Sequence, residues 1–153
     1  MAAHTATASY TDTTYAISAS LPATYDAAGY GATTITYTAI GKVIGFPALG
    51  SNRPTQEVPL INAAVEFIKG SARYGTGDMT MGDIPADAGQ VILKAAEASP
   101  NHYSMKITYP DGEIHYLDVI VNKWELSQQA ENTPMIRTAG IVLCKAPVVV
   151  AAA

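Results

Sequence analysis

A turn between two alternating segments constrains the fold of this 153-residue chain more than any other feature. Apolar and polar side chains alternate from Tyr103 to Tyr109, and again from Glu113 to Leu126. A period of two is typical of a β-strand whose two faces meet different environments. The intervening Pro110-Asp111-Gly112 is typical of a tight turn, because proline presets φ and glycine accepts the left-handed conformation. The pattern predicts a β-hairpin in which Trp124 shares a face with Ile114.

Other segments also have the composition of strands. Alternation from Tyr15 to Leu21 predicts a strand that Pro22 ends. The β-prone segments are Thr33–Phe46, Leu60–Lys69, Asp78–Met81 and Met135–Lys145. Residues 46–59 contain three prolines and are expected to form a long functional loop, and residues 70–77 form a second exposed loop. In the strand at 60–69, Glu66 alternates with apolar neighbours, so we expect one solvated face.

One segment has the pattern of a helix. Asp87 is a suitable N-cap, Gln90 completes a capping box, and Ser99-Pro100 ends the helix. The expected apolar stripe consists of Ala88, Val91, Ile92, Ala95 and Ala96. Such a short, alanine-rich helix requires a sheet to pack on. We therefore predict a mainly β fold, a β-sandwich or half-barrel of about six to eight strands with one flanking helix at about residues 87–98.

The composition along the chain divides it into three parts. Residues 1–14 have no periodicity and are expected to form a flexible arm, which either orders on a neighbouring subunit or is a tail without a role. Residues 15–146 form a single β-rich domain, and residues 147–153 form an apolar tail that is either an additional interface or disordered. The single cysteine, Cys144, excludes an internal disulfide and is expected to be a buried structural thiol.

The chain carries little charge. Charged residues make up 14% of it, against about 25% in a typical soluble protein. No apolar run approaches the roughly 20 residues of a membrane helix, so we expect no membrane partner. We therefore expect other copies of the chain to cover much of its surface. A net charge of −4 argues against a nucleic-acid binder, although it is compatible with a surface that nucleic acid passes without adhering.

Patterns that indicate catalysis or metal binding are scarce. The histidines lack the spacing of a zinc site, although two of them bracket the predicted hairpin and are close enough in sequence to approach each other across it. Three aspartates do not fit a calcium loop, and a lone GxG after a loop does not indicate a nucleotide site. We therefore expect no enzyme, no metal and no cofactor. The histidines are His4, His102 and His115, the aspartates are Asp78, Asp83 and Asp87, and the glycines of the GxG are Gly75 and Gly77.

Tyrosine dominates the aromatic residues, with nine Tyr against two Phe and one Trp. Tyrosines either occupy half-buried strands or lie in protein–protein interfaces, where amphipathic aromatics are enriched. Because they fall in expected loops, Tyr25, Tyr30 and Tyr74 are the candidate interface aromatics.

From Leu21 to Leu143, the order of these motifs resembles that of siphophage major tail proteins. The similar segments are Pro22–Gly50, FIKGSARYGTGDM, DAGQVILKAA and YSMKITYPDGEIHYLDVIVNKWEL. The resemblance implies a structural virion protein whose copies form hexameric rings that stack into a helical tail tube. Strands from each copy line the tube in a shared barrel, and the helix lies outside that barrel. The arm and the long loop bridge neighbouring rings.

The resemblance also implies the partners and the location. The partners are other copies of the chain, a tape-measure protein and tail-end or baseplate proteins, with DNA in transit during ejection. The location is the virion tail, with assembly in the host cytoplasm. Two alternatives remain open: another ring-forming or capsid-decorating protein of a phage or phage-like injection machine, and an enzyme or ligand-binding sandwich.

The resemblance assigns candidate contacts to individual residues. Glu66 is the candidate lumen-facing charge, with an outer-surface position as the alternative. The candidate inter-ring contacts are Tyr10, Pro47, Asn52, Arg53, Gln56 and Glu57.

Overall fold

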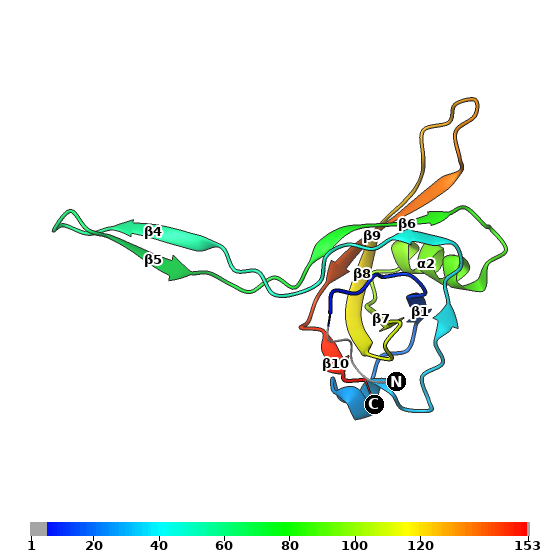
Figure 1. The fold of residues 1–153 in the computed structure, drawn as a ribbon, viewed down its shortest axis with the longest axis horizontal. Helices are drawn as coiled ribbons and strands as arrows, with labels where there is room; N and C mark the ends of the chain where they lie inside the picture. The colour runs from blue at the N-terminus through cyan, green and yellow to red at the C-terminus, as the bar shows by residue number, and fades with distance from the viewer. Residues whose placement is uncertain (1–5, 153) are drawn as a thin grey trace.

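The computed structural model describes residues 6–152, and its centre is one curved antiparallel sheet (Figure 1). The strand order is β2-β1-β7-β8-β9-β6-β3, and β10 pairs with β8. The strands of this sheet are β1 (Thr14–Ser18), β2 (Thr38–Ala39), β3 (Val43–Gly45), β6 (Thr76–Gly82), β7 (Tyr103–Thr108), β8 (Ile114–Leu126), β9 (Ile136–Leu143) and β10 (Val148–Val150). A separate pair consists of β4 (Thr55–Pro59) and β5 (Val65–Lys69). The helices are α1 (Ala27–Tyr30) and α2 (Ala88–Ala98). The expectation of a mainly β, half-barrel fold with a flanking helix is confirmed.

The predicted hairpin is formed by β7 and β8. Thr108 pairs with Ile114, and the Tyr109 N–H donates to the Glu113 carbonyl across the turn at 2.9 Å. Gly112 has a φ of 94°, the left-handed conformation that the turn motif requires. The predicted alternation is wrong beyond Val121, because the register with β9 shifts at that point. This β-bulge reverses the phase of the strand, so Trp124 packs against the core.

The core lies between one face of the sheet and α2. Strands β1, β6, β7, β8 and β9 contribute fully buried side chains, and the helix contributes Leu93 and Ala96. The helix and its cap are confirmed, but the predicted apolar stripe is only partly right: Ile92 and Ala96 pack in or against the core, whereas Ala88, Val91 and Ala95 are exposed. The buried side of α2 consists of Gly89, Gln90, Leu93 and Ala96.

Two residues at the start of α2 explain this rotation of the helix. A Cβ on Gly89 would lie 2.4 Å from the Ala39 carbonyl oxygen, so only glycine allows this approach to the β2 backbone. Gln90 is also turned inward, where its Nε2 donates to the carbonyl oxygens of Gly41 at 3.2 Å and Gly82 at 2.8 Å. The backbone contact of Gly89 and the hydrogen bonds of Gln90 therefore determine which face of α2 is buried, rather than the positions of its alanines.

The predicted capping box is half confirmed. The Asp87 carboxylate accepts hydrogen bonds from the backbone N–H groups of Gln90 and Gly41, each at 3.1 Å. A capping box requires the Gln90 side chain to accept a hydrogen bond from the Asp87 backbone N–H, but Gln90 has other partners. Its Oε1 accepts instead from Ile84 N–H at 3.1 Å. These bonds join α2 to the segments before β3 and after β6.

The segment before β3 differs from its prediction. Residues 33–46 form only the short strands β2 and β3, since Lys42 has a φ of 59°, which interrupts an extended backbone. Residues 23–32, which the turn-forming composition after Pro22 indicates as a loop around Tyr25 and Tyr30, contain α1. This helix is capped by Asp26, whose Oδ1 accepts from Gly29 N–H at 2.7 Å. Hydrogen bonding of this carboxylate to Gly29 N–H lowers the pKa of Asp26.

The apolar segment after Lys145 is partly ordered in the sheet. Val148 pairs with Tyr116 and Val150 with Ile114, so β10 extends the sheet along the first half of β8. A disordered tail is therefore wrong for residues 148–150. No helix within residues 6–152 is long and apolar enough to cross a bilayer.

Candidate functional site

The hairpin β4–β5 extends away from the rest of the molecule (Figure 1). Its register runs from Thr55 opposite Lys69 to Pro59 opposite Val65. The turn is closed by the Leu60 N–H, which donates to the Ala64 carbonyl at 2.8 Å, and Ala63 takes a φ of 68°. The predictions of a loop through residue 59 and of a strand from residue 60 are therefore wrong. Pro54 and Pro59 favoured a loop because proline is rare within strands. The strand between them forms by pairing with β5 after the turn.

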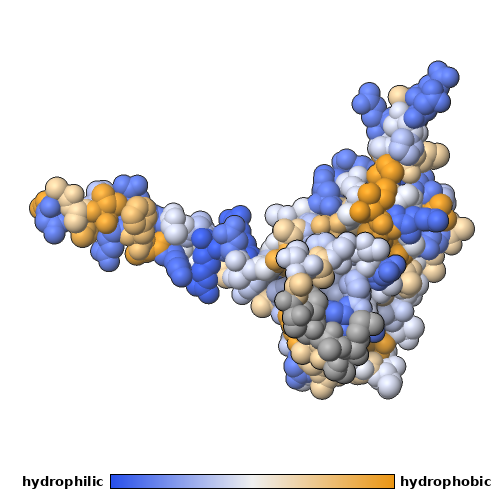
Figure 2. Space-filling view, in the orientation of Figure 1, coloured by the Kyte–Doolittle hydropathy of each residue, from blue (hydrophilic) through white to orange (hydrophobic). Residues whose placement is uncertain are grey.

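Apolar side chains project from both faces of this hairpin. Paired residues share a face, so Val58 and Ile68 lie on one face and Val65 and Phe67 on the other. Every residue of β5 is exposed, and the exposed fraction of Phe67 is 66%. Both faces of the strand are therefore solvated, so the expectation of a single solvated face is wrong. Figure 2 shows the apolar residues gathered along the projection. A lone two-stranded hairpin is at best marginally stable in water, so these side chains indicate a surface that another chain covers.

The base of the hairpin is fixed by backbone contacts. Asn52 and Arg73 exchange two N–H···O bonds of 2.7 Å, and Gly70 N–H donates to the Pro54 carbonyl at 2.7 Å. A Cβ on Gly70 would lie 3.1 Å from the Pro54 ring, which shows how closely the two segments approach. Arg53 lies between these contacts and is exposed. Its backbone is therefore held while its side chain is free to meet another molecule.

The structure brings together four of the six candidate inter-ring residues. Asn52 and Arg53 lie at the hairpin base, and Gln56 and Glu57 lie on β4. Pro47 lies beside β6, where a Cβ on Gly77 would be 2.7 Å from the Pro47 Cβ. Tyr10 lies elsewhere, with its ring centroid 5.9 Å from that of Tyr109.

Glu66 lies on the hairpin opposite Val58 rather than in the curved sheet. Its position toward a lumen stays a prediction. The sequence reasoning missed Phe67 and Ile68, although apolar residues at adjacent positions of one strand were a usable signal. Two adjacent apolar positions place one such side chain on each face of a strand.

The three candidate interface tyrosines have different environments. Tyr25 is half exposed, and Tyr74 is partly buried against the core. Tyr30 is 1% exposed and stacks on Tyr116, so the prediction of a surface aromatic is wrong for this residue. It belongs to a cluster of Tyr25, Tyr30 and Tyr37 that lies around Tyr116, on the side of the sheet opposite α2. Burial raises the pKa of Tyr30 and of Tyr37.

A second surface feature lies at the β7–β8 turn. A cavity of about 430 Å³ is lined by residues 8–10, by Tyr109 and Pro110, and by the turn that follows. The Tyr109 ring meets the His115 ring edge-on at 4.8 Å, and the Glu113 carboxylate oxygen Oε1 lies 2.6 Å from His115 Nε2. Burial, with smaller contributions from nearby tyrosines and Glu113, raises the pKa of Tyr109 to about 12. The walls of this pocket are thus aromatic and acidic.

His102 and His115 pair with different carboxylates rather than sharing one site. His102 Nδ1 lies 3.0 Å from the buried Asp118 carboxylate, whereas His115 pairs with Glu113. Within residues 6–152, no group of three potential metal-ligating side chains is assembled. His4 lies outside the described residues, as does part of the predicted arm. Cys144 is partly buried, and burial raises the pKa of its thiol.

Comparison with solved structures gives matches over nearly the whole chain. A chain in the sheath/tube terminator structure of the extracellular contractile injection system PVC has a TM-score of 0.63 at 8% identity, covering 97% of this chain and 100% of that one. A chain in the tail of an empty gene transfer agent particle, refined with C6 symmetry, has a TM-score of 0.59 at 11% identity, covering 89% and 95%. The chain has a tail-tube-like fold.

The tail-tube-like fold is also found in a chain of the anti-feeding prophage tube-terminating cap, with a TM-score of 0.56 at 11% identity over 99% and 95% of the two chains. No protein-family model and no curated protein matches the sequence. At such identities the likeness establishes the fold. The expectation from the order of the motifs is therefore confirmed at the level of architecture.

Proposed function

We propose that this chain is a structural subunit of a phage tail tube. Its copies associate into hexameric rings, and the rings stack into a hollow tube through which DNA passes. The observation that carries the proposal is the β4–β5 hairpin, whose apolar residues are exposed on both faces. Structures of a tail and of tube terminators contain chains of the same fold, which supports this class of function.

The hairpin and the body are different surfaces, so a contact between them is head-to-tail. Head-to-tail contacts either close into a ring or extend into a filament. A tube needs both kinds of head-to-tail contact: one closes the ring, and the other stacks the rings along the axis. Asn52, Arg53, Gln56 and Glu57 are the proposed contacts between rings, because they lie on the hairpin or at its base. Proposed partners are a tape-measure protein and tail-end proteins, in a virion tail assembled in the host cytoplasm.

The charge of the chain supports a passage rather than a binding site for DNA. A net charge of −4 gives a lumen surface that repels phosphates, provided that acidic groups such as Glu66 face it. This role needs no cofactor and no catalytic group. A tube subunit therefore accounts for a chain with few charges and many exposed apolar side chains.

A terminating ring is the second candidate function. Two of the similar structures are described as a sheath/tube terminator and a tube-terminating cap. A terminator stops a tube, so it forms a single ring and does not polymerise alone. The two functions therefore differ in what the purified chain assembles into.

Negative-stain microscopy of the purified chain tests the proposal. Uniform hollow tubes are expected, whereas isolated rings indicate a terminator and a monomer at high concentration contradicts both functions. The variant Phe67→Glu places a charge on the projecting hairpin and should abolish the tubes. Val91→Glu is the matched control, because Val91 is 52% exposed on α2, which the proposal places outside the barrel. Equal loss of tubes in both variants would remove the hairpin from the proposal.

A further inference from the structure

We propose that the pocket at the β7–β8 turn receives the Arg53 side chain of a second copy of this chain. This inference rests on the proposed self-assembly and names the surface that the hairpin base meets. It is drawn from three observations: the chemistry of the pocket, the exposed arginine at position 53 of the hairpin base, and the separation of the two within one chain.

The pocket has the groups that an arginine side chain binds. Tyr10 and Tyr109 provide aromatic rings, Pro110 an apolar wall, and Glu113 a carboxylate. A guanidinium stacks on aromatic faces and pairs with carboxylates, which a compact ammonium does less well. The hydrogen bond to His115 involves the Glu113 oxygen Oε1. A carboxylate has two oxygens and about four lone-pair sites, so Glu113 keeps acceptor capacity for a guanidinium.

The position of the pocket is fixed by the fold. Tyr109 N–H donates to the Glu113 carbonyl at 2.9 Å, and Glu113 N–H donates to Asp111 Oδ1 at 3.0 Å. The Tyr109 ring rests edge-on against His115. The turn therefore holds its aromatic and acidic groups in place before any partner arrives. A preorganised site loses less conformational entropy when a side chain enters it.

Arg53 is a cation at the hairpin base that suits such a site. It is exposed, and it makes no ion pair within the described residues. The bridge between Asn52 and Arg73 and the contact of Pro54 with Gly70 fix its backbone. Two other cations lie near the hairpin base. Arg73, the bridge partner of Asn52, is also exposed and unpaired within the described residues, and Lys69 lies diagonally across the ladder from Glu57.

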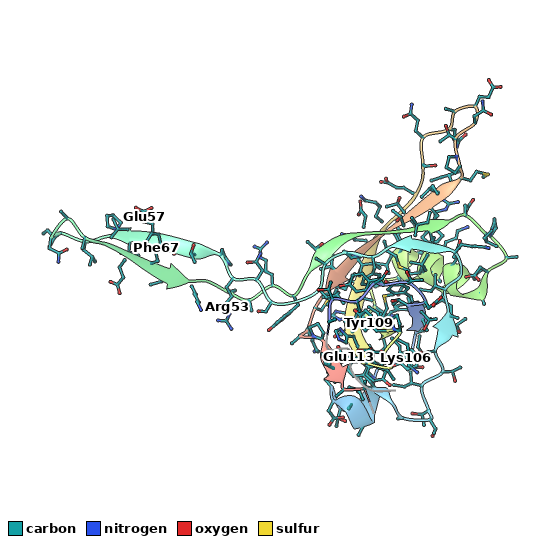
Figure 3. The ribbon with its side chains drawn as sticks, viewed as in Figure 1. Arg53, Glu57, Phe67, Lys106, Tyr109 and Glu113 are labelled. Carbon is teal, nitrogen blue, oxygen red and sulfur yellow. The ribbon has the colours of Figure 1, made fainter. Side chains whose placement is uncertain are left out.

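Arg53 does not reach the pocket of its own chain. Figure 3 shows Arg53 at the base of the projecting hairpin, well apart from Tyr109 and Glu113 on the body. The bridge between Asn52 and Arg73 ties the hairpin base to the segment that leads into β6, which keeps it there. The complementary groups can therefore meet only between two copies, and the contact joins the hairpin base of one copy to the β7–β8 turn of the next.

A charge exchange between two variants tests this contact. Arg53→Glu places a carboxylate against Glu113, and Glu113→Arg places a guanidinium against Arg53, so each variant alone should assemble poorly. In an equimolar mixture every contact between unlike variants pairs opposite charges, either in the native or in the reversed direction. We expect the concentration needed for assembly to rise at least about tenfold in each single variant. It should return to within about threefold of the original value in the mixture.

Sedimentation velocity measures assembly of any size, and microscopy of the same samples identifies tubes. Lys94→Glu is the matched control, since Lys94 is exposed on α2, and it should assemble normally. Thermal unfolding of each variant confirms that it is folded. Recovery in the mixture supports the contact whether the product is a tube or a smaller oligomer. Tubes of the original chain with no recovery in the mixture would overturn this contact alone, and a chain that stays monomeric would overturn it together with the proposed function.

Discussion

The ring of Tyr30 stacks on the ring of Tyr116, with centroids 5.4 Å apart and planes within 5° of parallel. Tyr30 belongs to α1 and Tyr116 to β8, so the stack fixes an irregular segment to the centre of the sheet. Tyr37 adds a hydrogen bond from its hydroxyl to the Tyr30 carbonyl at 3.0 Å. Residues 22–37 therefore cover the part of one side of the sheet around Tyr116, while α2 packs on the other side.

Tyr30→Ala should lower the free energy of unfolding by about 3 kcal/mol, because it leaves a cavity beside Tyr116. Chemical denaturation of the purified variant measures this loss. Tyr25→Ala is the control and should cost less than about 1 kcal/mol, since Tyr25 is half exposed. Equal losses in the two variants would contradict the role given to the Tyr30–Tyr116 stack.

Gly89→Ala should destabilise the chain although alanine is the better helix former. The helix gains up to about 1 kcal/mol from alanine. The new Cβ would lie 2.4 Å from the Ala39 carbonyl oxygen and 2.6 Å from the Ile40 Cα, which forces α2 away from β2. We expect a net loss of about 2 kcal/mol in the free energy of unfolding. An unchanged or higher midpoint of thermal unfolding would show that this contact is not restrictive.

Gln90→Ala should cost about 2–3 kcal/mol in the free energy of unfolding. Gln90 is 2% exposed, and its truncation leaves the Gly41 and Gly82 carbonyls and the Ile84 N–H without this partner. Denaturant titration against Gln129→Ala gives the comparison, because Gln129 is exposed in the β8–β9 loop. A loss as small as that of the control would mean that water replaces the side chain.

Stability should fall in alkaline solution. Burial raises the pKa of Tyr109 to about 12 and also raises those of Tyr30 and Tyr37, whereas unfolded tyrosine titrates near 10. The folded state therefore holds these protons more tightly. Their contribution is complete below about pH 10 and is lost as the pH rises toward 12, at up to about 1.4 kcal/mol per pH unit for each group. Denaturation at several pH values measures the slope, and Tyr109→Phe should reduce it.

Tyr10→Ala should separate assembly from folding. Tyr10 is 75% exposed, so its loss should change the free energy of unfolding by less than about 0.5 kcal/mol. The same change removes one wall of the pocket at the β7–β8 turn and should weaken assembly. Comparison of thermal unfolding with sedimentation of the same sample distinguishes the two effects. Normal assembly of this variant would limit the pocket to Tyr109 and Glu113.

Local signals were sufficient for the elements whose causes are local. Proline, aspartate and glycine at 110–112 predicted the β7–β8 hairpin, and Asp87 predicted the start of α2. The buried face of α2 was not predictable, because it depends on the contact of Gly89 with Ala39, which lies far away in the chain. The bulge after Val121 has a similar origin in the register between β8 and β9.

The candidate site also contains features that local sequence predicted and features that depend on residues far away in the chain. Loop composition placed Asn52, Arg53, Gln56 and Glu57 in one exposed region, and the structure places all four on the hairpin or at its base. Tyr30 is buried because a distant strand supplies Tyr116 beneath it. The pocket at the β7–β8 turn was not predictable, since it forms where residues 8–10 return to a turn far along the sequence.

Strand β8 has a mechanical consequence for the subunit. It is hydrogen-bonded to β7 along its first half on one edge, and to β10 and then β9 along the other. These bonds run perpendicular to the strand, so a pull along β8 loads them together, whereas a pull across the sheet opens them one after another. The subunit should therefore be stiff under tension along β8 and weaker across it. If β8 lies along the direction in which a particle is stretched or bent, the deformation will be concentrated at the base of the β4–β5 hairpin rather than in the sheet.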